Sequence, residues 1–201
     1  MRKYLFFILF LLSYNMYADS YFELDFSIAN TGFGINYSSN YDDNNELFIE
    51  LLSFEFIHKN TNIGIGISPF KYWYNFLWDE SAIENEYERI SFFNFNVNWN
   101  IVHRKNIFFG PFWSINYIFL ENSKIIWNNY IFTAGLRFKW SFNLFNNNIF
   151  HSFLSSEIGY RNINGINKLH FNLSMDLISL LYALAYNGGY GIINKNNNRR
   201  M

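Results

Sequence analysis

The chain has 201 residues, the length of a single domain, and combines 50% hydrophobic and 23% aromatic residues with only 15% charged residues. Soluble globular domains are about one quarter charged, and a mean hydropathy of -0.07 shows that apolar and polar residues are finely interleaved here. The net charge of -1 provides no basic footprint for nucleic-acid binding. The sequence contains no cysteine, which excludes disulfides, thiolate metal sites, a cysteine nucleophile and a lipid-anchored cysteine.

The first 18 residues have the layout of a secretory signal peptide. Two basic residues precede a continuous apolar run from Tyr4 to Leu12, and a more polar stretch ends at the small residue Ala18. This order of regions is typical of signal peptides. The run is shorter than the roughly 20 residues of a membrane-spanning helix. We therefore expect export and removal of residues 1–18, although Met16 occupies a position where a small residue is preferred.

Period-two alternation recurs along the rest of the chain. Successive side chains of a strand point to opposite faces, so this alternation predicts strands with one apolar and one polar face. The clearest case lies between Tyr130 and Phe142, where apolar residues alternate with polar or small residues such as Arg137 and Lys139. The predicted strands, in chain order, cover residues 20–37, 47–57, 63–74, 88–101, 107–119, 129–143, 149–161 and 169–177.

Three irregularities are expected within these strands. Residues 20–37 form one strand with a bulge near Thr31–Gly34, where glycine lies inside the pattern. Residues 47–57 are apolar on both faces, which predicts a second bulge. Pro69 interrupts its strand before the alternation resumes in the opposite phase. Glycines inside the strands are expected only to permit kinks; they are Gly32, Gly34, Gly64 and Gly66.

Short polar turns alternate with mostly longer loops. Residues 58–62, 103–106 and 146–148 are the short turns, and residues 38–45, 75–87, 121–126 and 162–167 form the other set. Spanning strands in a bilayer must pair all their backbone groups and therefore close into a barrel. Short turns on one side and long loops on the other are typical of outer-membrane barrels.

These patterns predict an all-β fold, an eight-stranded antiparallel up-and-down transmembrane β-barrel. The barrel would span residues 19–186, and residues 187–201 would form a polar C-terminal tail. A ten-stranded barrel, in which residues 20–37 form a hairpin and a further strand follows Ser179, is the second choice. It would place the long loop 75–87 in the periplasm and the short turn 58–62 outside, the reverse of the usual arrangement.

In its signal peptide, size and alternating strands, the chain resembles the small bacterial outer-membrane barrels of the OmpA, OmpX and OmpW type. The resemblance is one of pattern, and no residue motif selects one family. It implies location in the outer membrane, surrounding lipid, insertion by the barrel-assembly machinery, and a monomer. The likeness to OmpW also implies an alternative function, a narrow transport barrel for small or hydrophobic molecules.

Inward-facing charges are the first group of candidate functional residues. An eight-stranded barrel has an interior just wide enough for side chains to fill, and buried charges need partners. We therefore expect a charge network that fills the lumen and blocks conduction. Its predicted members are Glu23, Asp25, Arg137, Lys139, Glu157, Arg161 and Asp176.

An aromatic cluster at the outer rim is the second group. Aromatic residues are common at both membrane interfaces of such barrels. The alternative is an exposed binding patch on the acidic loop 75–87, for an extracellular ligand that the sequence does not identify. The rim residues are Tyr72, Trp73, Tyr74, Phe76 and Trp78.

No catalytic, cofactor or metal site is expected. His58 and His103 fall in predicted turns and are interpreted as solvated, while His151 and His170 fall on polar strand faces. His151 and Ser155 invite comparison with small outer-membrane lipid A deacylases and acyltransferases, but no family motif or HExxH spacing surrounds them. The expected function is a non-enzymatic barrel that is structural or interacts through its surface loops. A secreted soluble β-barrel that binds a lipid-like ligand is a further alternative.

Overall fold

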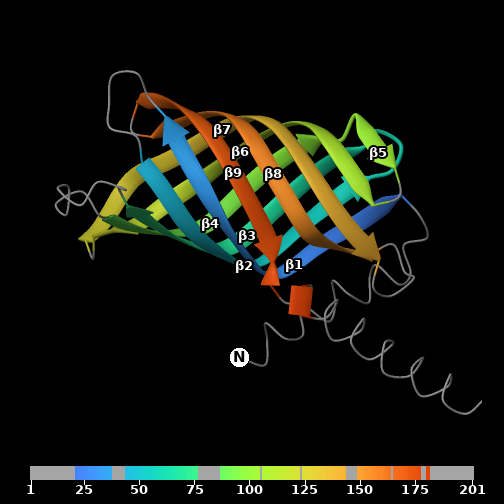
Figure 1. Cartoon of the computed structure of the whole chain (residues 1–201), viewed down its shortest axis with the longest axis horizontal. Coiled ribbons are helices and arrows are strands. Elements are labelled where there is room, and N and C mark those ends of the chain that lie inside the picture. The colour runs from blue at the N-terminus through green and yellow to red at the C-terminus, as the bar shows by residue number, and fades with distance from the viewer. Residues whose placement is uncertain are drawn as a thin grey trace, which may run out of the picture.

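The structure, a computed structural model, describes residues 21–37, 44–76, 87–104, 106–122, 124–143, 149–163, 165–177 and 180–181. Eight long strands wind around a common axis (Figure 1). They are β1 (Phe22–Tyr37), β2 (Asn44–His58), β3 (Ile63–Phe76), β4 (Tyr87–Trp99), β6 (Ile107–Glu121), β7 (Lys124–Asn143), β8 (Ile149–Ile163) and β9 (Ile166–Asp176). A short additional strand, β5 (Val102–Arg104), pairs with the start of β6. The predicted signal peptide and the polar tail lie outside the described residues.

Antiparallel pairing closes the sheet. Consecutive long strands pair with one another, β4 pairs directly with β6, and β1 pairs with β9, so that the eight long strands form a ring. The prediction of a closed eight-stranded antiparallel barrel is thereby confirmed. The segment expected at residues 20–37 contributes one strand, β1, rather than a hairpin. Within the described part of the chain, no helix is both long and apolar enough to cross a membrane.

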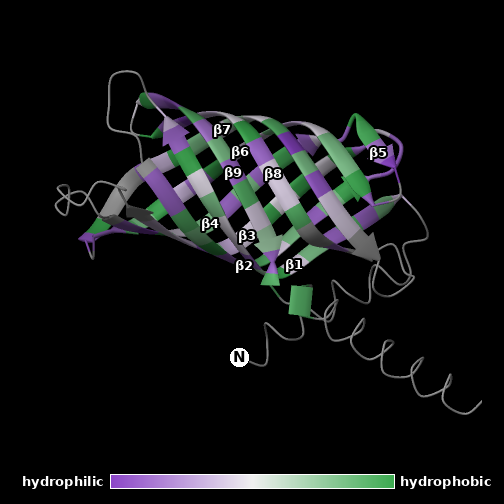
Figure 2. Ribbon diagram, in the orientation of Figure 1, coloured by the Kyte–Doolittle hydropathy of each residue, from purple (hydrophilic) through white to green (hydrophobic). Residues whose placement is uncertain are grey.

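The alternation of each strand places polar residues inside and apolar residues outside. In β7, Thr133, Lys139 and Ser141 are buried, whereas Leu136 and Trp140 remain 45% and 46% exposed. Hydrophobic and hydrophilic residues alternate in the same way along the other strands (Figure 2). The barrel therefore has the inverse arrangement of a soluble core: its interior is largely polar and its exterior is apolar.

Four adjacent strands exchange their inward and outward faces at one common level. In β2, for example, Glu46 and Phe48 are buried before the exchange, and Glu55 and Ile57 are buried after it. The exchange occurs in β1 to β4 at positions that the flanking register places opposite one another. We call this row the seam; its members are Ile28, Leu52, Pro69 and Phe93.

Local backbone geometry explains how the seam forms. Leu52 and Phe93 have positive φ values of 57° and 66°, an uncommon conformation for residues other than glycine. Pro69 lacks an amide hydrogen and cannot donate to the ladder. At the seam, two consecutive side chains point outward, so that Phe93 is 81% exposed. The inward side chains on either side of the seam are accordingly one residue farther apart.

The seam begins where β9 ends. β9 stops at Asp176, and beyond that level Leu24–Phe26 of β1 pair in parallel with residues 149–151 of β8. The wall therefore contains one strand fewer at the end of the barrel that carries β5. The Asp176 carboxylate accepts hydrogen bonds from the amides of Ile28 at 3.1 Å and Ala29 at 3.3 Å. It thus satisfies amides at the point where β9 leaves the wall.

The seam shows that the bulges were partly predicted at the wrong positions. The register of β1 with β2 and with β9 is unbroken from Asn30 to Asn36, so the bulge expected near Thr31–Gly34 is absent there. The changes expected within residues 47–57 and at Pro69 do occur, but without an inserted residue, because β1 to β4 change face together. The register shifts only against β6, where two residues of β4 oppose Tyr117 in a β-bulge.

The barrel lumen as candidate functional site

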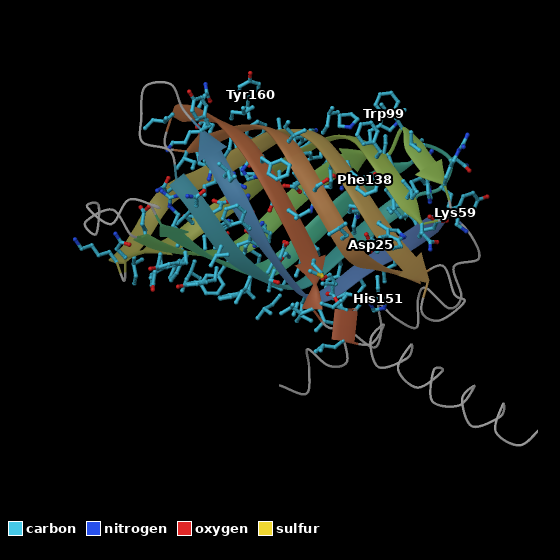
Figure 3. All side chains as sticks on the ribbon, viewed as in Figure 1. Asp25, Lys59, Trp99, Phe138, His151 and Tyr160 are labelled. Carbon is cyan, nitrogen blue, oxygen red and sulfur yellow. The ribbon has the colours of Figure 1, made fainter. Side chains whose placement is uncertain are left out.

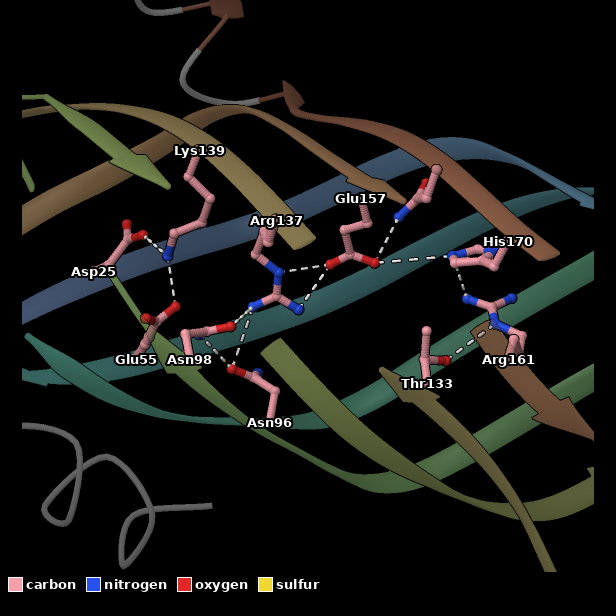
Figure 4. Close-up of polar contacts among 11 residues, drawn as sticks. Asp25, Glu55, Asn96, Asn98, Thr133, Arg137, Lys139, Glu157, Arg161 and His170 are labelled. Atoms are coloured by element: carbon pink, nitrogen blue, oxygen red, sulfur yellow. Dashed lines mark hydrogen bonds and ion pairs between the residues drawn. The ribbon is translucent and has the colours of Figure 1, made fainter. Parts of the chain in front are cut away.

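A lysine bridges two carboxylates inside the lumen (Figure 4). The Lys139 Nζ lies 2.5 Å from Asp25 Oδ2 and 2.5 Å from Glu55 Oε2. These residues come from β7, β1 and β2, so the contact joins walls of the barrel that are far apart in sequence. All three side chains are less than one tenth exposed. An ammonium ion held between two carboxylates compensates charges that would be costly to bury alone.

An arginine–glutamate pair lies next to this bridge. β7 and β8 place Arg137 directly opposite Glu157, and Arg137 Nε and Nη2 each lie 2.7 Å from Glu157 Oε1. The remaining nitrogen, Nη1, donates to Asn98 Oδ1 at 2.7 Å. The guanidinium also lies 4.4 Å from the ring centroid of Phe112. Arg137 is therefore held on several sides by charged, polar and aromatic groups.

A third group surrounds Arg161. Its Nη1 hydrogen-bonds Glu46, and its Nη2 lies 2.9 Å from His170 Nε2. A guanidinium only donates, so His170 Nε2 accepts and the ring carries its proton on Nδ1, which lies 3.0 Å from Asn36 Oδ1. His170 Nε2 is also 3.9 Å from Glu157 Oε2. His170 therefore lies between the Arg161 group and the Arg137 pair and accepts its hydrogen bond from Arg161.

The remaining predicted lumen charges are Glu23 and Asp176. Glu23 Oε2 lies 3.2 Å from His103 Nε2, and Asp176 accepts a hydrogen bond from Ser27 Oγ in addition to the two wall amides. His103 was expected to be solvated, which is wrong. Its ring stacks on Phe108 at 4.5 Å because β5 turns the chain back over the end of the lumen.

Glu46 and Glu55 are buried lumen carboxylates that the sequence analysis missed. They fall on opposite faces of a regular strand, and the seam at Leu52 turns both of them inward. A Cβ added to Gly34 would lie 2.7 Å from Glu46 Oε1, and one on Gly64 would collide with the Glu55 carboxylate. These glycines therefore provide space for inward glutamates, a role different from the expected kinks.

Two clusters of buried apolar side chains lie in the lumen beside the ion pairs. Ile57 and Phe108 pack together toward the end that carries β5. Between the clusters, a cavity of about 70 Å³ lies against the inward residues that flank the seam, and it has room for only a few water molecules. The larger cluster, near the other end, contains Phe48, Trp73, Ile118, Ile131 and Ile163.

The predicted aromatic rim is divided by this arrangement. Tyr72 and Tyr74 are half-buried, whereas Trp73 is 1% exposed and belongs to the larger apolar cluster in the lumen. The Phe76 side chain, Trp78 and the acidic loop lie outside the described residues. Trp73 therefore fills the lumen rather than presenting a surface to the outside.

The histidine–serine pair on β8 is not assembled for catalysis. Four residues separate His151 from Ser155, and the rise of a strand places their Cα atoms roughly 10–13 Å apart. The His151 ring instead packs edge-on against Phe26, with the centroids 5.6 Å apart. Among the described residues, no group of three or more histidine, aspartate or glutamate side chains is arranged to hold a metal ion.

Fold and lumen together define the class of this protein: a closed eight-stranded antiparallel β-barrel with an ion-paired interior and an apolar exterior. Comparisons with protein-family models, curated proteins and solved structures found no match for the chain. Its function is therefore inferred from the surfaces of the barrel itself.

Proposed function

We propose that this chain is a non-enzymatic β-barrel of a bacterial outer membrane that does not conduct and that acts structurally or through its surface loops. The observation that carries the proposal is the apolar exterior, which continues around the whole ring. Each barrel strand contributes at least one large apolar side chain that is between 38% and 52% exposed: Ile35, Leu47, Ile65, Phe92, Trp113, Leu136, Ile158 and Phe171.

Such an exterior is unfavourable in water and favourable in lipid. The largest apolar patch on a typical soluble monomer covers about 300–600 Å², whereas here apolar side chains encircle the barrel. The eight barrel strands contain between 11 and 20 residues, and about 9–11 are enough to cross a bilayer. A closed ladder also supplies the backbone partners that lipid lacks.

The filled lumen favours a closed barrel over the alternative of transport. Ion pairs cross it, and Trp73 and Phe108 belong to the buried apolar clusters beside them. The alternative of a secreted barrel that binds a lipid-like ligand requires an apolar lumen, and the described lumen is lined largely by charged and amide side chains. Interactions with other molecules are then left to the loops and the exterior.

Fractionation of the native cell tests the membrane proposal. The protein is expected in the outer-membrane fraction, and it should migrate faster on a denaturing gel before boiling than after, because closed barrels resist detergent. Recovery as a soluble protein with no shift on boiling would overturn the proposal.

Planar-bilayer recordings separate the closed barrel from the transport barrel. The purified, folded protein is expected to give no regular conductance steps in salt solution. Reproducible single-channel steps from protein that shows the heat-dependent gel shift would instead favour transport.

A further inference from the structure

An open groove lies on the outer surface of the barrel where β5 meets the wall. It has a volume of about 510 Å³ and is lined by Arg104, Asn106, Ile107 and Trp140. Arg104 pairs with Ile107 in the β5–β6 ladder, and Ile107 pairs with Trp140 in the β6–β7 ladder. These three residues therefore form a row across three strands, in which a guanidinium is followed by an aliphatic side chain and an indole.

Arg104 differs from the other arginines of the described chain. Arg89, Arg137 and Arg161 each form an ion pair with a glutamate inside the barrel or at its rim. Arg104 is exposed, and no described carboxylate lies within ion-pair distance of it. Among the described residues, Arg104 is therefore the arginine whose guanidinium faces solvent without a carboxylate beside it.

The turns at this end of the barrel are basic, although Glu23 of β1 lies 3.2 Å from His103 Nε2 in β5. The turn segments 58–62 and 100–106 contain lysine, arginine and histidine but neither aspartate nor glutamate. Lys59, in the first of these turns, lies at the same end of the barrel as β5 (Figure 3). The row also crosses the boundary between the polar turns and the apolar band, since Ile107 and Trp140 are 42% and 46% exposed.

We propose that this groove binds the headgroup of an anionic phospholipid. The planar donors of Arg104 match a phosphate group. Trp140 and Ile107 provide an apolar surface for the first carbons of the acyl chains, at the depth where indoles favour a membrane interface. The inference rests on the proposed membrane location. The expected ligand is a phospholipid rather than lipid A because the groove lies at the end with the short turns, which are expected on the periplasmic side.

Lipid retention by the whole folded protein tests the site. The protein, Arg104→Gln and Lys59→Gln are each folded into bicelles that mix phosphatidylcholine with phosphatidylglycerol, and retained lipid is counted by native mass spectrometry. Lys59→Gln is the matched control because it removes one positive charge at the same end but outside the groove. We expect preferential retention of phosphatidylglycerol, weakened on the order of five-fold by Arg104→Gln and nearly unchanged by Lys59→Gln.

Each other outcome has a definite meaning. Equal losses in both variants would show a diffuse basic belt and overturn the site, as would a wild-type protein that folds but has no preference for phosphatidylglycerol. Stronger retention of lipid A, or full competition by free inorganic phosphate, would assign the guanidinium to a different phosphate source. Failure to fold into bicelles, detected as the loss of the heat-dependent gel shift, would instead overturn the proposed function on which the inference rests.

Discussion

The Arg137–Glu157 pair offers the sharpest test of a packed, charged lumen. The substitution Arg137→Met preserves much of the side-chain length but leaves Glu157 without the two nitrogen contacts at 2.7 Å. The pair is buried, with side-chain exposures of 13% and 12%, and breaking a buried pair costs about 3–5 kcal/mol. Glu157 keeps a hydrogen bond from Asn172 at 3.4 Å. We therefore expect a loss at the low end of that range, about 3 kcal/mol.

The measurement is urea unfolding of the barrel in detergent micelles, followed by tryptophan fluorescence. A loss of this size shifts the midpoint by about 1 M or more, since urea m-values are typically about 1–3 kcal/mol per M. Combining Arg137→Met with Glu157→Gln removes both charges, and the double variant should recover to within about 1 kcal/mol of wild type.

A matched pair near the barrel end provides the control. Arg89 lies 2.7 Å from Glu121, and their side chains are 6% and 22% exposed. Arg89→Met leaves behind a carboxylate that solvent reaches more readily than Glu157, so it should cost less than Arg137→Met. The reasoning is refuted if Arg137→Met leaves the midpoint unchanged, or if the double variant is as unstable as the single one. Either result would mean that the two charges are not buried against each other.

Three further results are expected. Leu136→Arg places a charge in the apolar band and should lower the unfolding free energy in lipid by about 2–4 kcal/mol. The control Leu47→Arg, near the barrel end, should lower it by only about 0–1 kcal/mol. Equal unfolding free energies of the two variants in vesicles would contradict a lipid-facing band. A single cysteine at Glu88 should react with an impermeant reagent on intact cells and one at Asn60 should not, and the reverse labelling would invert the proposed sidedness. Asp176→Ala leaves two wall amides and a serine hydroxyl without their acceptor and should cost about 2–3 kcal/mol, with faster hydrogen exchange of those amides; unchanged exchange would show that β9 does not end in this way.

Much of the fold is contained in local patterns. The alternation in β7, where Leu136 and Trp140 point outward and Lys139 inward, depends only on the two-residue period of a strand. The same period led to the inward assignment of Asp25, Arg137 and Glu157, because each lies on a strand segment without an irregularity. Closure into a ring was expected because strands that span a bilayer must pair all their backbone groups, and the alternating lengths of the connections favoured eight strands.

The residues that pair with those charges were harder to predict from the sequence. Glu46 and Glu55 are absent from the predicted lumen network, and a regular strand could not turn both of them inward. The exchange of faces at Leu52 allows both. Pro69 indicated an irregularity in the sequence of β3, but nothing in the sequence of β2 alone located the matching change at Leu52.

Local alternation was enough to predict the eight long strands and, away from the seam, their apolar and polar faces. Only the tertiary structure decided which of those faces meet across the lumen, because that depends on strand register and on the loss of one wall strand where β9 ends at Asp176. From that point, Ile28, Leu52, Pro69 and Phe93 change face together, since neighbouring strands keep their register only if all of them change at the same level. This constraint acts between different strands, so the position of the seam cannot be predicted from the sequence of any one of them.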